Sequence, residues 1–304
     1  MQNITYGNII LAHKGALGDF LLAWPVFLSI RAQFPEAQVY WHGKDAFLPW
    51  LGPIGIKKLH SAYISALDGL YSSTRWPETL DGFKVFWFGL DRVTIPGSFH
   101  ELLFLKAVQP GEHRHVRRSY INSLNELGIS YKKDWHLDWI NLFGRHTAGR
   151  KVLLFPGSGN PAKNWPLERF LDTARYFEQE GFSAVVVLGP AEEHLQIPGD
   201  LQQARCTSLK ELQNLVLEAC LMLGNDSGPM HLGAMFKKPG LVLFGPTPVS
   251  VWRPEGIQVL KTPADCAPCS WTARIRCSNP ICMAAIDQRH VKSWGDKFLN
   301  RLPP

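Results

Sequence analysis

Three segments of the chain share one pattern, in which a short apolar run is followed by a loop of small and polar residues and then by a helix-like stretch. They span residues 8–25, 151–166 and 219–235. Strand-like and helix-like stretches alternate elsewhere too, which is typical of a parallel sheet covered by helices. In open sheets of this kind, ligands bind in the crevice outside the carboxyl ends of the strands. The pattern therefore predicts an α/β fold whose site lies in these loops.

The expected elements fall into two halves of similar plan. We expect strands at 8–12, 37–41 and 84–89, then at 151–155, 183–188, 219–223 and 240–244, and helices at 21–33, 167–180, 210–217 and from about Met230. The stretch 143–150 is polar and contains Gly144 and Gly149, which indicates a boundary between the halves. With 304 residues, the chain is long enough for two domains of about 150 residues each.

The loop of the middle segment carries groups that suit a pyrophosphate. Ser158 and Gly159 follow the strand, and Lys163 precedes a helix that Pro166 can open at its first turn. A hydroxyl, free backbone N–H groups and an ammonium group together are typical of a phosphate site.

The third segment places Asp226, Ser227 and Gly228 between a buried strand and a helix. The N-terminus of a helix favours negative charge and offers free N–H groups to an anion. Asp or Ser before a helix is also a common cap with no further function. Taken alone, this segment leaves both interpretations open.

The first segment holds Gly15, Gly18 and Asp19 at the start of an apolar helix. Its two glycines allow the backbone to approach a ligand closely. Asp19 is expected near the mouth of the crevice.

In combination, the three loops resemble those of glycosyltransferase family 9, the lipopolysaccharide heptosyltransferases. The matching motifs are Gly18-Asp19, then Pro156-Gly-Ser158 with Lys163-x-Trp165-Pro166, then Asp226-Ser-Gly-Pro-Met-His231 followed by Leu243-Phe-Gly-Pro-Thr247. They stand in the family's order over nearly the whole chain. The resemblance implies the GT-B architecture, in which two Rossmann-like domains face each other across a cleft. Residues 1–146 would form the acceptor-side domain and 147–289 the nucleotide-sugar-binding domain, with a C-terminal helix in 290–304 packing back on the first.

The same resemblance implies a reaction and roles for single residues. The reaction would be an inverting transfer of heptose from ADP-heptose onto a lipopolysaccharide core, with no metal or other cofactor required. Asp19 would be the catalytic base, Lys163 would neutralise the pyrophosphate, and His231 would contact phosphate or donor sugar. The remaining donor contacts would come from Gly18, Ser158, Gly159, Asp226, Ser227 and Gly228. Either Glu192 or Glu193 would hold the ribose, and the sequence leaves this choice open.

The charge of the chain indicates an anionic partner. Its net charge is +6, and no segment resembles a nucleic-acid-binding module. The basic run His113-Arg114-His-Val-Arg117-Arg118 lies in the predicted acceptor-side domain. Arg114, Arg117 and Arg118 are therefore candidates for binding an anionic glycolipid acceptor, although such runs are often solvated loops.

The chain has no run of 18 apolar residues and no basic region at its N-terminus. We therefore expect no transmembrane segment and no secretory signal. The expected location is the cytoplasm, with contact at the inner face of the inner membrane.

Four of the six cysteines are clustered as Cys266-x2-Cys269-x7-Cys277-x4-Cys282. The spacing within each pair fits a tetrahedral structural zinc site, which would be closed to catalysis. The alternative is a set of reduced thiols in a packed loop, since disulfides are rare in the cytoplasm.

Three functions compete with glycosyl transfer. Gly157-Ser-Gly159-Asn-Pro-Ala162 contains G-x-G-x-x-A after a strand, which is a dinucleotide pattern. Pro161 and Pro166 oppose a nicotinamide oxidoreductase because they interrupt the helix start that the pattern needs. The second competing function is non-catalytic binding of a nucleotide sugar, and the third is epimerisation of a nucleotide sugar on the GT-B fold.

Overall fold

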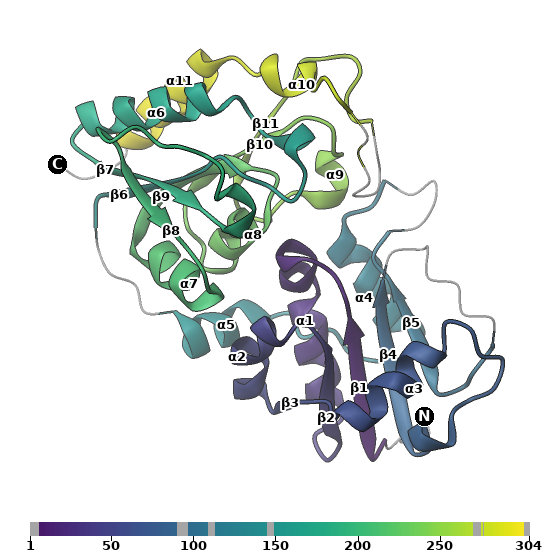
Figure 1. Cartoon of the computed structure of the whole chain (residues 1–304). Coiled ribbons are helices and arrows are strands. Elements are labelled where there is room, and N and C mark those ends of the chain that lie inside the picture. The colour runs from purple at the N-terminus through teal and green to yellow at the C-terminus, as the bar shows by residue number, and fades with distance from the viewer. Residues whose placement is uncertain are drawn as a thin grey trace. The chain divides into compact units, whose positions relative to one another are not determined.

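The computed structural model describes residues 6–89, 97–108, 113–144, 149–269, 275 and 277–300. Its contacts divide the chain into two units, Met1–Phe143 and Gly144–Pro304. Each unit is built on one parallel sheet with helices on its faces (Figure 1). The division falls at the start of the polar stretch 143–150. No helix in the described ranges has both the length and the apolar character needed to cross a bilayer.

The sheet of unit 1 has the strand order β3-β2-β1-β4-β5, and all neighbouring strands run parallel. The strands are β1 (Asn8–His13), β2 (Gln38–Gly43), β3 (Ile56–Lys58), β4 (Phe83–Gly89) and β5 (Leu102–Lys106). The order of the strands reverses between β1 and β4. In a parallel sheet, such a switch point opens a crevice at the carboxyl ends of the two strands.

The helices of unit 1 are α1 (Leu17–Gln33), α2 (Leu48–Leu51), α3 (Ile64–Gly69), α4 (Val116–Glu126) and α5 (Trp135–Phe143). Short 3₁₀ turns lie at 45–47, 52–54, 61–63 and 78–80. Every residue of α1 from Phe20 to Ile30 is buried. A helix that is apolar on all sides must be covered on all sides, and α1 accordingly contacts both α4 and α5 as well as lying against the sheet.

The sheet of unit 2 has the order β11-β10-β9-β6-β7-β8, again with parallel neighbours. The strands are β6 (Lys151–Phe155), β7 (Ser183–Leu188), β8 (Gln202–Arg205), β9 (Ala219–Asn225), β10 (Gly240–Phe244) and β11 (Gln258–Lys261). This is the strand order of a six-stranded Rossmann sheet, with its switch point between β6 and β9.

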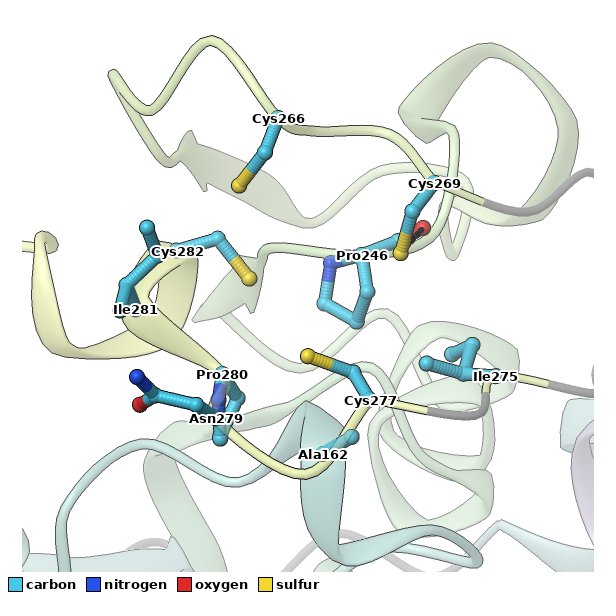
Figure 2. A pocket seen from close by; sticks show the side chains of 10 residues that line it. All are labelled: Ala162, Pro246, Cys266, Cys269, Ile275, Cys277, Asn279, Pro280, Ile281 and Cys282. Atoms are coloured by element: carbon cyan, nitrogen blue, oxygen red, sulfur yellow. Dashed lines mark hydrogen bonds between the residues drawn. The ribbon is translucent and has the colours of Figure 1, made fainter.

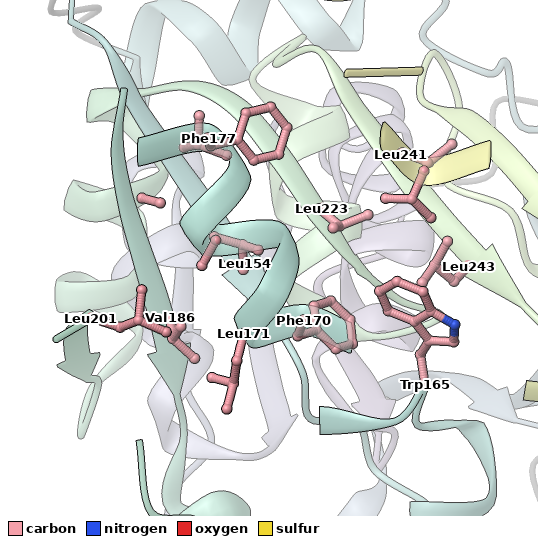
Figure 3. Close-up of a cluster of buried hydrophobic side chains, with 14 of the residues drawn as sticks. Leu154, Trp165, Phe170, Leu171, Phe177, Val186, Leu201, Leu223, Leu241 and Leu243 are labelled. Carbon is pink, nitrogen blue, oxygen red and sulfur yellow. The ribbon is translucent and has the colours of Figure 1, made fainter. Parts of the chain in front are cut away.

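The helices of unit 2 are α6 (Leu167–Gln179), α7 (Leu209–Glu218), α8 (Gly228–Met235), α9 (Val249–Trp252), α10 (Ile281–Ala284) and α11 (Gln288–Leu299), with 3₁₀ turns at 161–163 and 190–192. Alternate residues of the central strands, among them Leu154, Val186 and Leu223, join Phe170 and Phe177 of α6 in one buried cluster (Figure 3). The alternation follows from the two-residue period of a strand.

Helix α11 packs against α6 within unit 2. Its Val291 is fully buried in the same hydrophobic cluster as Phe170 and Phe177, and Trp294 and Phe298 pack against that cluster. The hydroxyl of Tyr176 on α6 also bonds to the Asp296 carboxylate. The resemblance implied that 290–304 packs on the first domain. The structure shows that the apolar stripe of α11 is buried in the core of unit 2, and packing on the first domain stays a prediction.

Candidate functional site

Four loops of unit 2 meet at the carboxyl edge of its sheet, because β7, β6, β9 and β10 are consecutive neighbours. The loop after β6 contains Ser158 and Lys163, and the loop after β9 contains Asp226. These two strands border the switch point, so their loops flank the crevice that such a topology creates.

Lys163 and Asp226, which are 63 residues apart in the chain, are in direct contact. The Lys163 ammonium donates to the Asp226 backbone oxygen at 2.6 Å and lies 3.2 Å from carboxylate atom Oδ2. Thr247, after β10, donates to the same Oδ2 at 2.8 Å. Only 18% of the Lys163 side chain and 8% of the Asp226 side chain are exposed. The arrangement fixes a positive charge at the carboxyl edge of the sheet.

Asn225 holds the two loops together, a role that no pattern in the sequence indicates. Its side chain is fully buried. The amide nitrogen donates to the Pro156 oxygen at 2.8 Å, and the amide oxygen accepts from the Trp165 N–H at 2.9 Å. Trp165 itself is buried and donates from Nε1 to the Ile286 oxygen at 3.0 Å. Both ends of the Lys163 loop are therefore anchored.

Helix α8 begins beside this pair, with Ser227 as its N-cap. The Ser227 side chain is buried, and its Oγ has no hydrogen-bond partner within the described parts of the chain. Gly228 opens the helix, and the buried His231 follows Ser227 by one turn on the same face. A free hydroxyl, a helix N-terminus and the adjacent ammonium group form a site for an oxyanion.

Ser158 and Gly159 lie in the same region but differ in environment. Ser158 Oγ lies 2.7 Å from the Asn160 oxygen and 2.6 Å from Asn164 Oδ1, so its hydroxyl shapes the loop. Gly159 is exposed, and a Cβ placed there would meet no atom within 4 Å.

The structure distinguishes between the two glutamates. Glu192 accepts from the Gly189 N–H at 2.9 Å, and its side chain lies directly over Gly157, in the loop after β6. A Cβ on Gly157 would fall 2.1 Å from the Glu192 carboxyl carbon. Glu193 is exposed. Glu192 is therefore the carboxylate that faces the candidate site.

In unit 1, Asp19 lies in the first turn of α1, and its Oδ2 accepts from the Ala16 N–H at 2.9 Å. Gly18 and Asp19 are half-buried. A Cβ on Gly15 would fall 2.6 Å from the Asp19 Cβ and 2.7 Å from His13 Cε1, so only glycine fits between them. The Asp19 charge also helps to raise the pKa of the buried Tyr120.

The three arginines of the basic run do not form one exposed surface. Arg118 is exposed and Arg114 is half-buried. Arg117 is buried, and its guanidinium lies 4.5 Å above the centre of the Trp135 ring. The cation–π contact holds the Arg117 side chain against Trp135 within unit 1, and its contact with an acceptor stays a prediction.

The cysteines Cys266, Cys269, Cys277 and Cys282 line one pocket of about 450 Å³ (Figure 2). Cys282 is buried, whereas the other three are exposed. Burial and the neighbouring thiols raise the pKa of Cys269 and of Cys282. No three His, Cys, Asp or Glu side chains among the described residues are placed to hold a metal ion. The structure therefore does not support zinc at these thiols.

The G-x-G-x-x-A pattern does not open a helix. A 3₁₀ turn at Pro161–Lys163 follows it, and α6 begins only at Leu167. A dinucleotide fingerprint needs its glycines at the start of the helix. This geometry disfavours a nicotinamide oxidoreductase.

Comparison with known proteins agrees with these features. The model of glycosyltransferase family 9 (heptosyltransferase) matches residues 125–279. A lipooligosaccharide heptosyltransferase 2 of Campylobacter jejuni is 32% identical over 277 residues, covering 83% of this chain and 86% of the relative.

Two solved structures are similar over nearly the whole chain. A family 9 glycosyltransferase of Veillonella parvula has a TM-score of 0.70 at 20% identity, covering 98% of this chain and 99% of that one. The ADP-heptose LPS heptosyltransferase II of Escherichia coli has a TM-score of 0.64 at 15% identity, with coverage of 97% and 99%. These similarities confirm the predicted α/β fold of the GT-B class.

His13 predicts a pH dependence of stability. Burial lowers its pKa from 6.5 to about 4 in the folded chain. The unfolded chain therefore takes up a proton first as the pH falls, and the stability present above pH 6.5 is lost progressively towards pH 4. The full loss is about 3 kcal/mol, at about 1.4 kcal/mol per pK unit. We expect the free energy of unfolding in urea to be lower at pH 5 than at pH 7.5 in the wild type. This difference should be smaller in His13→Phe. Equal pH dependence in both proteins would contradict the assignment.

Proposed function

The chain belongs to glycosyltransferase family 9, and from this premise we propose that it transfers heptose from ADP-heptose onto a lipopolysaccharide core acceptor. The names of its relatives support both halves of the proposal. The C. jejuni relative is a lipooligosaccharide heptosyltransferase, and similar solved structures were determined with ADP and with an ADP-heptose analogue. The observation that carries the proposal is the Lys163 ammonium held at the N-terminus of α8.

In this proposal the donor diphosphate lies against α8. The Lys163 ammonium, the Ser227 hydroxyl and the N–H groups at Ser227 and Gly228 oppose the charge that develops on the leaving diphosphate. His231 contacts phosphate or donor sugar, and Glu192 accepts hydrogen bonds from the ribose hydroxyls. Gly18, Ser158 and Gly159 shape the donor loops, and Asp226 positions Lys163.

Asp19 is the proposed base. The acceptor hydroxyl attacks the anomeric carbon from the side opposite the diphosphate, which inverts the configuration. The new C–O bond forms as the bond to the diphosphate oxygen breaks, the proton passes to Asp19, and ADP leaves. Since Lys163 and α8 supply positive charge, we propose that the step needs no metal ion.

We also propose that the enzyme works at the inner face of the inner membrane. The net charge of +6 supports attraction to an anionic glycolipid surface. Arg114 and Arg118 are candidates for acceptor contacts, and Arg118 is the more exposed of the two.

The donor can be tested by calorimetry with ADP, UDP, GDP and NAD, each with and without EDTA. We expect ADP to bind most tightly and EDTA to leave its Kd unchanged, because the charge partners are protein groups. A preference for UDP or GDP would contradict the ADP-sugar assignment. A preference for NAD would favour an oxidoreductase, and no binding would favour a protein without catalytic activity. Turnover of ADP-heptose in the absence of an acceptor would favour an epimerase.

Replacing Asp19 by Asn tests the base. The amide oxygen can still accept from Ala16 N–H but cannot take a proton at neutral pH. We expect kcat to fall by about 10²- to 10⁴-fold, with the Kd for ADP unchanged. Asp45→Asn is the matched control, because Asp45 is an exposed carboxylate of the same unit, paired with Lys58. Normal turnover in Asp19→Asn would remove Asp19 as the base.

Gly157→Ala tests the ribose contact through Glu192. The added methyl group would displace the Glu192 carboxylate from the loop after β6. We expect affinity for ADP to fall about tenfold, the effect of losing one hydrogen bond to a charged group. The melting temperature should change little, because the displaced group is the end of a flexible side chain. Gly199→Ala is the control, since its Cβ would meet nothing within 4 Å. An unchanged Kd would count against Glu192.

A further inference from the structure

A second group of polar side chains lies at the carboxyl edge of the sheet of unit 1. Lys14 directly follows β1, His42 lies at the end of β2, and Trp87 lies near the end of β4. Asp68 on α3 and Tyr71 just after it complete the group. None of these five side chains has a part in the chemistry assigned to Asp19.

The Asp68 carboxylate is the centre of this group. Its Oδ1 lies 2.7 Å from the Lys14 ammonium and 3.9 Å from Nε2 of His42. The Lys14 ammonium also lies 5.4 Å from the centre of the Tyr71 ring. Tyr71 meets Trp87 edge to face at 5.2 Å between ring centres.

The group has a buried floor and an exposed rim. His42 and Trp87 are 8% and 2% exposed, whereas the side chains of Lys14 and Asp68 are 49% and 50% exposed. Tyr71 is 40% exposed, which is unusual for a large aromatic residue of this chain. Nε2 of His42 is buried without a hydrogen-bond partner in the described ranges. Burial and the Lys14 charge lower the pKa of His42.

This combination suits a sugar that carries a negative charge. A carboxylate accepts hydrogen bonds from sugar hydroxyls, and an ammonium group pairs with a carboxylate or phosphate on the sugar. An exposed aromatic ring offers apolar surface with a polar edge.

We infer that Lys14, Asp68 and Tyr71 form a subsite for an anionic sugar of the acceptor. The inference rests on the proposed function. Lys14 lies in the short loop after β1, and Asp19 lies in the first turn of the helix that follows it. A sugar held at Asp68 is therefore at the same edge of the sheet as the proposed base.

The test combines kinetics with direct binding. The probe is a lipid-free core oligosaccharide that lacks the transferred heptose, titrated at saturating ADP-heptose. We expect Asp68→Asn and Tyr71→Ala each to raise the acceptor KM about tenfold, while the donor KM and the Kd for ADP stay unchanged. Asp45→Asn, which breaks the Lys58–Asp45 pair with the same change in charge, is the control and should leave the acceptor KM unchanged.

Two further arms separate the outcomes. Removing phosphate from the oligosaccharide distinguishes a sugar phosphate from a sugar acid as the partner of Lys14. Calorimetry measures binding of the oligosaccharide to the wild type and to Asp68→Asn, and it tests the subsite even if no transfer occurs. Failure of the proposed function can therefore be distinguished from failure of the subsite. Equal oligosaccharide affinity in wild type, Asp68→Asn and Tyr71→Ala would overturn the inference, as would an equal loss in Asp45→Asn.

Discussion

The buried amide of Asn225 is the interaction on which the candidate donor site depends. It joins the loop after β6 to the end of β9 by two hydrogen bonds, one to Pro156 and one from Trp165. A buried side-chain amide whose nitrogen and oxygen both form hydrogen bonds holds its partners in place. Leaving one of these buried groups unpaired costs about 1–3 kcal/mol. The position of Lys163 follows from this anchoring, because the residue lies on the loop that Asn225 closes. The Rossmann strand order brings the two loops together, and Asn225 sets their final spacing.

The sequence predicted the central strands well because their apolar runs are long and buried on both faces. Strands 151–155, 183–188 and 240–244 have the expected bounds. The edge strands β3, β5, β8 and β11 were not expected. Three of them, β3, β8 and β11, are three or four residues long and partly polar, as in Gln202–Arg205. Their extended form comes from the hydrogen bonds of a neighbouring strand, which no local pattern records. The burial of α11 in the core of unit 2 depends on long-range packing of its apolar stripe, which the sequence alone does not specify.

The site was predictable at the level of loops and less so at the level of contacts. Lys163 and Asp226 were both expected in the donor site, but their direct pairing, supported by Thr247 and Asn225, joins residues far apart in sequence. The choice of Glu192 over Glu193 depends on the space left by Gly157. Arg117 is another example. A basic run is typical of a solvated loop, but the ring of Trp135, which lies on another helix, covers the Arg117 guanidinium. The cysteine spacing likewise fitted a metal site. The four thiols line one pocket, but no three metal-ligating side chains among the described residues are placed to hold an ion.

The ion pair between Lys163 and Asp226 has a consequence for product release. Before a donor arrives, the ammonium is already neutralised by a carboxylate that Thr247 holds in place. In the proposed reaction, the incoming diphosphate would replace Asp226 as the anionic partner of Lys163, so that binding exchanges one ion pair for another. The free energy gained is then the difference between two ion pairs, which is smaller than the strength of the new pair alone. If the donor binds as proposed, the Asp226 carboxylate would therefore compete with the departing nucleotide for Lys163 and favour its release over tight retention.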